Sequence, residues 1–188
     1  MQIDLAVVYL SGMTDPLSTL VLGGARSGKS RFAEKLAAES GLQQIYIATA
    51  QTWDDEMRQR VATHVERRGD AWTTVEEPLN LVEALKSSCS PGAFVLVDCL
   101  TLWLTNIMLA ERDIAEESAE LLSVIRGLPG PCALVSNEVG YGIVPENALA
   151  RRFRDEAGLL NQRLAEVCGH VVLVAAGLPL TLKGSPTK

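Results

Sequence analysis

The stretch LVLGGARSGKS at residues 20–30 constrains the fold of this chain more than any other feature. A short apolar run leads into Gly23, and four residues later come Gly28, Lys29 and Ser30, which satisfies the pattern GxxxxGK[ST]. In such a loop the backbone N–H groups turn inward around phosphate oxygens, and glycines tolerate the positive φ angles that the turn needs. An amphipathic helix pattern follows directly. The stretch therefore predicts a site for a nucleoside triphosphate, made of Gly23, Gly24, Ala25, Arg26, Ser27, Gly28, Lys29 and Ser30.

Two residues of this loop have separate expected roles. Lys29 places a cation on the β and γ phosphates, and the hydroxyl of Ser30 binds Mg²⁺. A second ligand is expected from FVLVD, an apolar run that ends in Asp98. A carboxylate in that place is typical of a Walker B strand, although an aspartate can also end a strand only as a cap. We therefore expect Mg²⁺ between Ser30 and Asp98.

Short β-rich runs alternate with helical patterns along the chain, which is typical of an α/β fold with a largely parallel sheet. Several of the runs are almost continuously apolar, as in strands covered on both faces. The expected strands are Leu20–Leu22, Gln44–Thr49, Thr73–Val75, Phe94–Val97, Cys132–Ser136, His170–Ala175 and a last edge at Leu180–Leu182. The expected helices are Lys29–Ser40, Asp54–Arg68, Leu79–Ser87, Ile114–Arg126 and Glu146–Val167. A buried helix is also expected after Asp98, and Gly158 offers a point at which the last helix can divide in two.

Composition is that of an ordinary globular protein and argues against some partners. Of 188 residues, 47% are hydrophobic and 21% are charged, which suits one domain with a substantial core. The net charge of −6 and the absence of a long basic block argue against a nucleic-acid partner. Two apolar stretches, at residues 1–13 and 94–110, are interrupted by polar residues, so we expect no membrane insertion.

We expect a single domain over residues 1–188, in which 1–17 form an N-terminal extension and 184–188 a frayed tail. The cysteines are far apart in the sequence and form no CxxC pair; they are Cys89, Cys99, Cys132 and Cys168. With only two histidines in the chain, a zinc site is not expected. Scattered cysteines are typical of reduced thiols in a cytoplasmic protein.

His64 lies in a charged segment that has a helical pattern. It is four residues from both Arg60 and Arg68, so the three side chains are neighbours on a helix. Two nearby cations disfavour the imidazolium and keep the ring neutral and nucleophilic. The arginines can also bind phosphate oxygens through paired N–H groups. From these residues alone, a surface histidine among solvated arginines remains an open alternative.

Four blocks of sequence together resemble the bifunctional adenosylcobinamide kinase / adenosylcobinamide-phosphate guanylyltransferase family. They are GGARSGKSRFAE, YIATAQTWDDEMRQRVATHVERR, VLVDCLTLWLTN and SNEVGYGIVPENALARRFRDEAGLLNQRLA. The resemblance runs from residue 20 to residue 182. The phosphate loop alone is shared by many NTPases, whereas the last block is much more specific to the family.

The resemblance implies a RecA-like, three-layer P-loop NTPase fold that supports two reactions. A nucleoside triphosphate, GTP or ATP, first phosphorylates the hydroxyl of the aminopropanol arm of adenosylcobinamide. GTP then gives GMP to an enzyme histidine, from which GMP passes to the cobinamide phosphate. The matching histidine is His64, and Lys29 is expected to assist both steps. Nucleotide contacts are implied for Thr49, Ala50, Gln51, Val65, Glu66, Arg67, Arg68, Glu76 and Asp98, with Glu77 as the alternative to Glu76.

The resemblance also implies a homo-oligomer, namely a trimer, and a docking site for the corrinoid. Asn137, Glu138 and Gly140 follow an expected strand, and ligand crevices lie at the carboxyl ends of parallel strands. These three residues are candidates for the corrinoid site, or else they form a glycine-rich connection capped by Asn137.

The remaining aromatic and basic clusters are expected to serve the structure. Tryptophan is more often found in a core than against a cofactor. No ligand role is therefore assigned to Trp53, Trp72 or Trp103. The arginines of the last helix are expected to be solvated or paired with Asp155 and Glu156; they are Arg151, Arg152 and Arg154.

Two other functions remain open from the sequence. One is a P-loop kinase with a single activity on a small molecule, in which His64 is structural. The other is a nucleotide-gated binding protein. A switch GTPase of that class would need the guanine-binding tetrapeptide NKxD, which the chain lacks.

Overall fold

The computed structural model describes residues 17–51 and 71–184 of the chain. The strands are β1 (Ser18–Gly23), β2 (Gln43–Ala48), β3 (Trp72–Glu76), β4 (Ala93–Asp98), β5 (Cys132–Asn137), β6 (His170–Ala175) and β7 (Leu178–Lys183). The helices are α2 (Lys29–Ser40), α4 (Leu81–Ser88), α5 (Leu100–Leu109), α6 (Ile114–Arg126) and α7 (Ala148–Val167). All the strands join one sheet in the order β3-β2-β4-β5-β1-β6-β7.

The first six strands are parallel, and only β7 runs antiparallel to its neighbour β6. A tight turn joins these last two strands, with positive φ angles of 52° at Ala176 and 79° at Gly177. The carboxyl ends of the parallel strands meet at one edge of the sheet, which we call the carboxyl edge. Strand β5 lies between β1 and β4, and Leu134 is paired with Leu20 on one side and Val97 on the other. The ends of β1 and β4 are therefore about 10 Å apart, since each strand spacing is about 4.8 Å.

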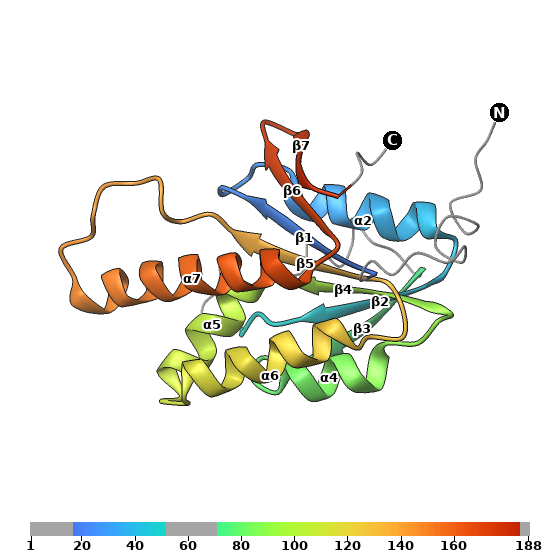
Figure 1. The fold of residues 1–188 in the computed structure, drawn as a ribbon, viewed down its shortest axis with the longest axis horizontal. Helices are drawn as coiled ribbons and strands as arrows, with labels where there is room; N and C mark the ends of the chain where they lie inside the picture. The colour runs from blue at the N-terminus through green and yellow to red at the C-terminus, as the bar shows by residue number, and fades with distance from the viewer. Residues whose placement is uncertain (1–16, 52–70, 185–188) are drawn as a thin grey trace.

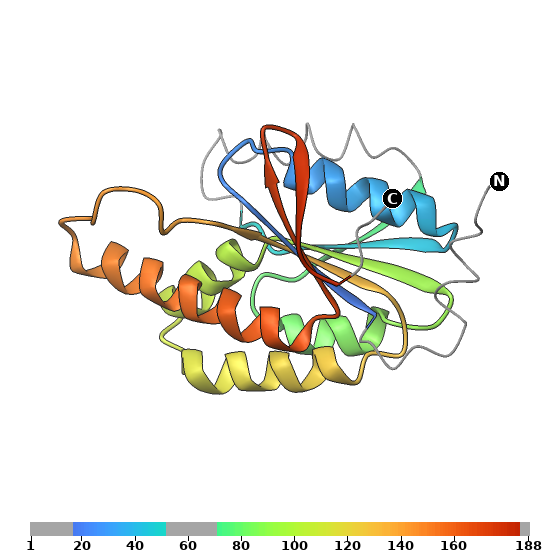
Figure 2. The ribbon, with the colours of Figure 1, turned by 45° about the horizontal axis from the view of Figure 1, so that its top comes forward.

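Helices cover both faces of the sheet, which confirms the expected three-layer α/β arrangement. Figures 1 and 2 show α2 on one face and α4 to α7 on the other. Successive residues of β1 point to opposite faces, so Leu20 and Leu22 join the core under α4–α7 while Val21 joins the core under α2. Within the described residues, no helix is long and apolar enough to cross a membrane.

Some helix boundaries lie where the sequence predicts them, and others are shifted by a side chain that caps the helix. Helix α2 ends at Gly41, whose φ is 67°, as its sequence predicts. Helix α7 begins two residues later than expected, because the side chain of Asn147 accepts hydrogen bonds from Leu149 N (2.8 Å) and Ala150 N (3.3 Å). The expected break at Gly158 is wrong, since α7 is one continuous helix.

Helical spacing in the sequence predicts that Leu149, Leu160 and Leu164 share one buried stripe on α7, but only part of this stripe is buried. Leu149 is 54% exposed, whereas Leu160 and Leu164 are buried in the core. The first turns of α7 extend beyond the sheet (Figure 1), so no strand covers them.

Three of the buried cysteines, Cys89, Cys132 and Cys168, lie close together in one core although they are far apart in the sequence, whereas Cys99 lies in the other core. The Cys89 thiol is hydrogen-bonded to that of Cys132, and Cys168 lies near enough to Cys132 to affect its ionisation. Burial raises the pKa of Cys168 to about 11. These thiols form part of the core. Among the described side chains, no group of three or more His, Cys, Asp or Glu residues is arranged to hold a metal ion.

Candidate active site

The loop between β1 and α2 has the geometry of a phosphate-binding loop. Gly28 has a φ of 99°, a left-handed conformation that side chains other than glycine rarely adopt. Gly23 is equally restricted, because a Cβ there would lie 2.4 Å from the hydroxyl of Ser27. The carbonyl of Ser27 accepts a hydrogen bond from Gly177 N at 2.8 Å, which ties the loop to the β6–β7 turn. The tip, formed by Gly24, Ala25 and Arg26, is exposed.

Lys29 is the buried cation of this loop. Its side-chain ammonium donates a hydrogen bond to Gly24 O at 3.0 Å, and the residue is only 8% exposed. Burial lowers the pKa of Lys29, while the charges of Asp98 and Cys99 partly oppose that shift. The charge of Asp98 thus acts on Lys29 at the carboxyl edge. Ser30, the first residue after Lys29, is partly exposed.

Thr49 connects the ends of β2 and β4 at the same edge. Its hydroxyl donates to Cys99 O at 2.8 Å and accepts from Cys99 N at 2.8 Å, and the residue is fully buried. The backbone N–H and the carbonyl of Cys99 both bond to this hydroxyl, which fixes the chain directly after Asp98. The hydroxyl of Thr49 is therefore used inside the protein, whereas Ala50 and Gln51 are partly exposed.

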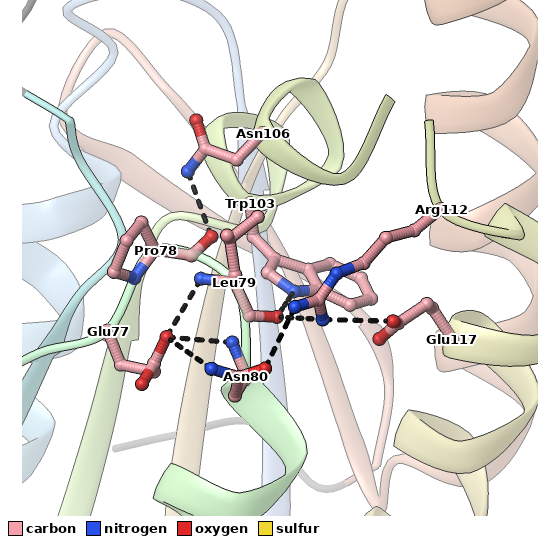
Figure 3. Close-up of polar contacts among 8 residues, drawn as sticks. All are labelled: Glu77, Pro78, Leu79, Asn80, Trp103, Asn106, Arg112 and Glu117. Carbon is pink, nitrogen blue, oxygen red and sulfur yellow. Dashed lines mark hydrogen bonds and ion pairs between the residues drawn. The ribbon is translucent and has the colours of Figure 1, made fainter. Parts of the chain in front are cut away.

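Glu77 fixes the loop between β3 and α4 and leaves Glu76 free to face solvent. The carboxylate of Glu77 accepts hydrogen bonds from Leu79 N at 3.0 Å and Asn80 N at 2.8 Å (Figure 3). Partial burial would raise the pKa of Glu77, but the hydrogen bonds from Asn80 and Leu79 and the charge of Arg112 lower it. Glu76 ends β3 and is exposed.

Helix α5 and the segment between α5 and α6 hold that loop from the other side. The indole N–H of Trp103 donates to Leu79 O at 3.0 Å, and the guanidinium of Arg112 donates to the side-chain oxygen of Asn80 at 3.0 Å (Figure 3). Arg112 also pairs with Glu117 at 3.1 Å. Trp103 is fully buried, which confirms its expected place in the core.

Asn106 is a site residue that the sequence reasoning missed. It is 5% exposed on α5, and its side-chain amide donates to Thr49 O at 2.8 Å and to Pro78 O at 2.9 Å. An amide in the middle of the apolar run LTLWLTNIML is the signal that marks it, because a buried polar group has to find partners.

The end of β5 completes the carboxyl edge. The Asn137 amide donates to the hydroxyl of Thr101 at 2.7 Å, and the carboxylate of Glu138 accepts from Gly140 N at 2.8 Å. Both candidates thus have structural partners, and the Asn137 amide contacts Thr101 of α5. Beyond them, the β5–α7 connection carries large exposed apolar side chains at Tyr141 (85% exposed) and Ile143 (97% exposed).

Some expected site residues lie outside the described part of the chain. These are His64, Val65, Glu66, Arg67 and Arg68, together with the expected helix Asp54–Arg68 and Trp53.

The arginines of α7 follow the expected ion-pair interpretation in one case, because Arg154 pairs with Asp155 at 3.0 Å. Arg151 instead donates to the backbone carbonyls of Pro145 and Glu146.

Comparison with known proteins gives consistent matches over nearly the whole chain. The model of the family described as cobinamide kinase / cobinamide phosphate guanyltransferase matches residues 19–182. The bifunctional adenosylcobalamin biosynthesis protein CobP of Pseudomonas aeruginosa PAO1 is 54% identical over 169 residues, which cover 89% of this chain and 98% of that protein. The corresponding protein CobU of Escherichia coli K12 is 41% identical over 179 residues, covering 87% of this chain and 98% of that protein.

Solved structures resemble the fold at much lower identity. A Pyrococcus horikoshii OT3 protein has a TM-score of 0.54 at 10% identity, and the match covers 96% of this chain and 93% of that one. An ATPase from a bacterial type III secretion system has a TM-score of 0.50 at 9% identity, covering 90% of this chain and 57% of that one. These similarities, together with the loop geometry, show a P-loop NTPase fold.

Proposed function

Because the chain belongs to the cobinamide kinase / cobinamide phosphate guanyltransferase family, we propose a division of its two reactions among its own residues. The protein is a bifunctional enzyme of adenosylcobalamin biosynthesis that acts as a kinase and as a guanylyltransferase. One observation supports the division: the phosphate loop carries a buried lysine, Lys29, and the charge of Asp98 at the carboxyl edge affects the pKa of that lysine. One cradle then serves the triphosphate in both steps.

In the kinase step, the hydroxyl oxygen of the aminopropanol arm attacks the γ-phosphorus. The bond from that phosphorus to the β–γ bridging oxygen breaks, and the nucleoside diphosphate leaves. Positioning and charge stabilisation dominate such transfers. The backbone N–H groups of the loop and the ammonium of Lys29 stabilise the charge that develops on the phosphoryl and leaving oxygens.

In the guanylyl step, we assign the nucleophile to His64. A neutral imidazole nitrogen attacks the α-phosphorus of GTP, a P–N bond forms, and pyrophosphate leaves. A phosphate oxygen of the cobinamide phosphate then attacks the same phosphorus and releases the histidine. This assignment rests on the sequence around His64, which lies outside the described residues.

The guanosine contacts are proposed for the segments that follow β2 and β3. Two observations refine the proposal: the Thr49 hydroxyl is already bonded to Cys99, and the Glu77 carboxylate is already bonded to Leu79 and Asn80. Contacts from this edge therefore fall to Ala50, Gln51 and Glu76, while Thr49 positions the segment, since its backbone N–H and carbonyl are also bonded within the protein. Further contacts are proposed from Val65, Glu66, Arg67, Arg68 and Asp98.

Mg²⁺ is proposed between Ser30 and Asp98. A hydroxyl and a carboxylate are oxygen ligands of the kind that Mg²⁺ prefers, and this cation usually keeps waters and phosphate oxygens in its other positions. The pair at the carboxyl edge fits that requirement. When bound, the ion neutralises charge on the phosphate oxygens.

The corrinoid is proposed to dock beside Asn137, Glu138 and Gly140. The support is their position at the carboxyl edge, next to the phosphate loop: Glu138 N donates to Gly23 O at 3.0 Å. We also propose, from the family resemblance, a single-domain homo-oligomer, a trimer, in the cytoplasm.

The experiment that tests the division is incubation of the intact protein with GTP labelled at the α-phosphate. We expect label on the wild-type protein that is labile in acid and stable in base, as a phosphoramidate is, and none on His64→Ala, which keeps its kinase activity. His170→Ala is the matched control, since His170 is the other histidine of the chain. An active kinase without label on the wild type would favour the single-activity kinase. Full GMP transfer by His64→Ala would rule out the covalent route.

A further inference from the structure

The side chain of Asn106 connects the segments that follow β2 and β3, beyond the point where backbone hydrogen bonds pair these two strands. The last backbone hydrogen bond between the β2 and β3 chains runs from Glu77 N to Ala48 O at 2.9 Å. Beyond this point Leu79 N turns to the Glu77 carboxylate. The carbonyls of Thr49 and Pro78 both accept from the Asn106 amide instead, at 2.8 Å and 2.9 Å (Figure 3 shows the second).

Both donors of the amide are used in this way, and the residue is 5% exposed. Its orientation is therefore fixed by two acceptors on two different chain segments. Through Thr49, whose hydroxyl bonds to Cys99, the same contact reaches the chain that follows Asp98. Asn106 thus lies where the segments after β2, β3 and β4 are brought into one arrangement.

We propose that Asn106 is a positioning residue for the nucleoside part of GTP. It holds residues 49–51 at a set distance from Glu76 and from Asp98, while the phosphate loop keeps its shape through other bonds, among them Gly177 N to Ser27 O. The proposal rests on the guanosine contacts assigned above to Ala50, Gln51 and Glu76. Asn106 does not itself touch the reacting atoms.

The test compares two ligands that share phosphates but differ in the nucleoside. The dissociation constants of GTP and of inorganic tripolyphosphate are measured with Mg²⁺ on the wild-type protein, Asn106→Leu and Asn106→Asp. Both variants keep the branched shape of the amide but donate neither hydrogen bond. We expect GTP binding to weaken about tenfold, as for the loss of about one net hydrogen bond, and tripolyphosphate binding to stay unchanged.

Leu104→Ala is the matched control for loss of stability. Leu104 is fully buried on the same helix, and its truncation lowers the thermal midpoint by opening a cavity in the core. We expect this variant to bind both ligands as the wild type does. Asn106→Asp serves as the second variant if Asn106→Leu does not fold.

Three results would overturn the proposal: GTP binding unchanged in the Asn106 variants, equal weakening of both ligands, or the same selective loss in Leu104→Ala. Failure of the proposed function is a separate result, because then the wild-type protein takes no label from GTP. The comparison of the two ligands still decides the role of Asn106 in that case.

Discussion

At the scale of single residues, Lys29 is the group that we propose to assist both reactions. Its ammonium is buried beside the loop carbonyl of Gly24 and feels the charge of Asp98. A cation held in such a place stabilises phosphate charge more strongly than it would in water, because little solvent screens it. The same residue should therefore matter for γ-phosphoryl transfer and for departure of pyrophosphate.

Lys29→Ala is expected to lower kcat/KM of both the kinase and the guanylyltransferase by about 100-fold or more, the usual effect of removing one fixed donor of charge stabilisation. Lys35→Ala is the control: Lys35 lies on the same helix, but its side chain is 66% exposed and pairs with Glu39. Separate assays with labelled ATP and labelled GTP measure the two activities. Loss of only one activity would mean that the two steps use different phosphate sites.

At the scale of elements, the loop between β3 and α4 depends on the charge of Glu77. Its carboxylate accepts two backbone N–H groups, as a helix cap does, and these bonds keep its pKa below the ordinary value of 4.5. A carboxyl with a lowered pKa stabilises the folded state at pH values above its unfolded pKa. That contribution is lost as the pH falls through the folded pKa.

Glu77→Ala is expected to lower the free energy of unfolding by about 1 kcal/mol at pH 7, as for the loss of a cap. The difference from the wild type should shrink as the pH falls from 4.5 through the lower folded pKa, because the wild-type carboxyl then takes up a proton. Urea unfolding at several pH values measures this. Glu83→Ala is the control, because the Glu83 side chain is 72% exposed and pairs only with Lys86, and such pairs contribute little. A difference independent of pH would contradict the role given to the charge.

Sequence patterns predict most elements of this fold because most strands carry an apolar run and some helices carry an ending signal, such as Gly41 after α2. Helices α2 and α6 begin and end where the sequence predicts. What the patterns cannot supply is long-range pairing. The order of the strands and the bonds of Thr49 to Cys99 and of Asn106 to Thr49 join residues about fifty positions apart, and a local pattern carries no trace of the partner. The prediction that Leu149 is buried is wrong for the same reason: its helical spacing matches the stripe, but the sheet does not extend over the start of α7.

At the scale of the whole molecule, one sheet is shared by two cores. Trp103 belongs to the core under α4–α7, and Ala33 and Ala37 of α2 belong to the other core. Because β1 supplies residues to both, neither core can be lost while the sheet persists intact. The molecule should therefore unfold as a unit, in agreement with the proposed single domain.

Urea unfolding is expected to give one transition, with the same midpoint by tryptophan fluorescence and by far-UV circular dichroism. Trp103, which is fully buried, should dominate the change in fluorescence. The α2 core variant Ala37→Gly and the opposite-core variant Leu104→Ala should each shift both signals together. Separate midpoints for the two probes would show that the two cores unfold independently.

The position of β5 between β1 and β4 also limits how substitutions can change the nucleotide site. The span between the loop of Lys29 and the carboxylate of Asp98 is set by two rows of backbone hydrogen bonds, which do not depend on side-chain identity. Substituting side chains at the carboxyl edge changes the contacts that a ligand makes, but it does not change the distance between the loop of Lys29 and Asp98. Attempts to change the nucleotide base that the enzyme accepts should accordingly be directed to Ala50, Gln51 and Glu76, which are partly or fully exposed, and should spare Thr49 and Glu77, whose side chains hold this edge together.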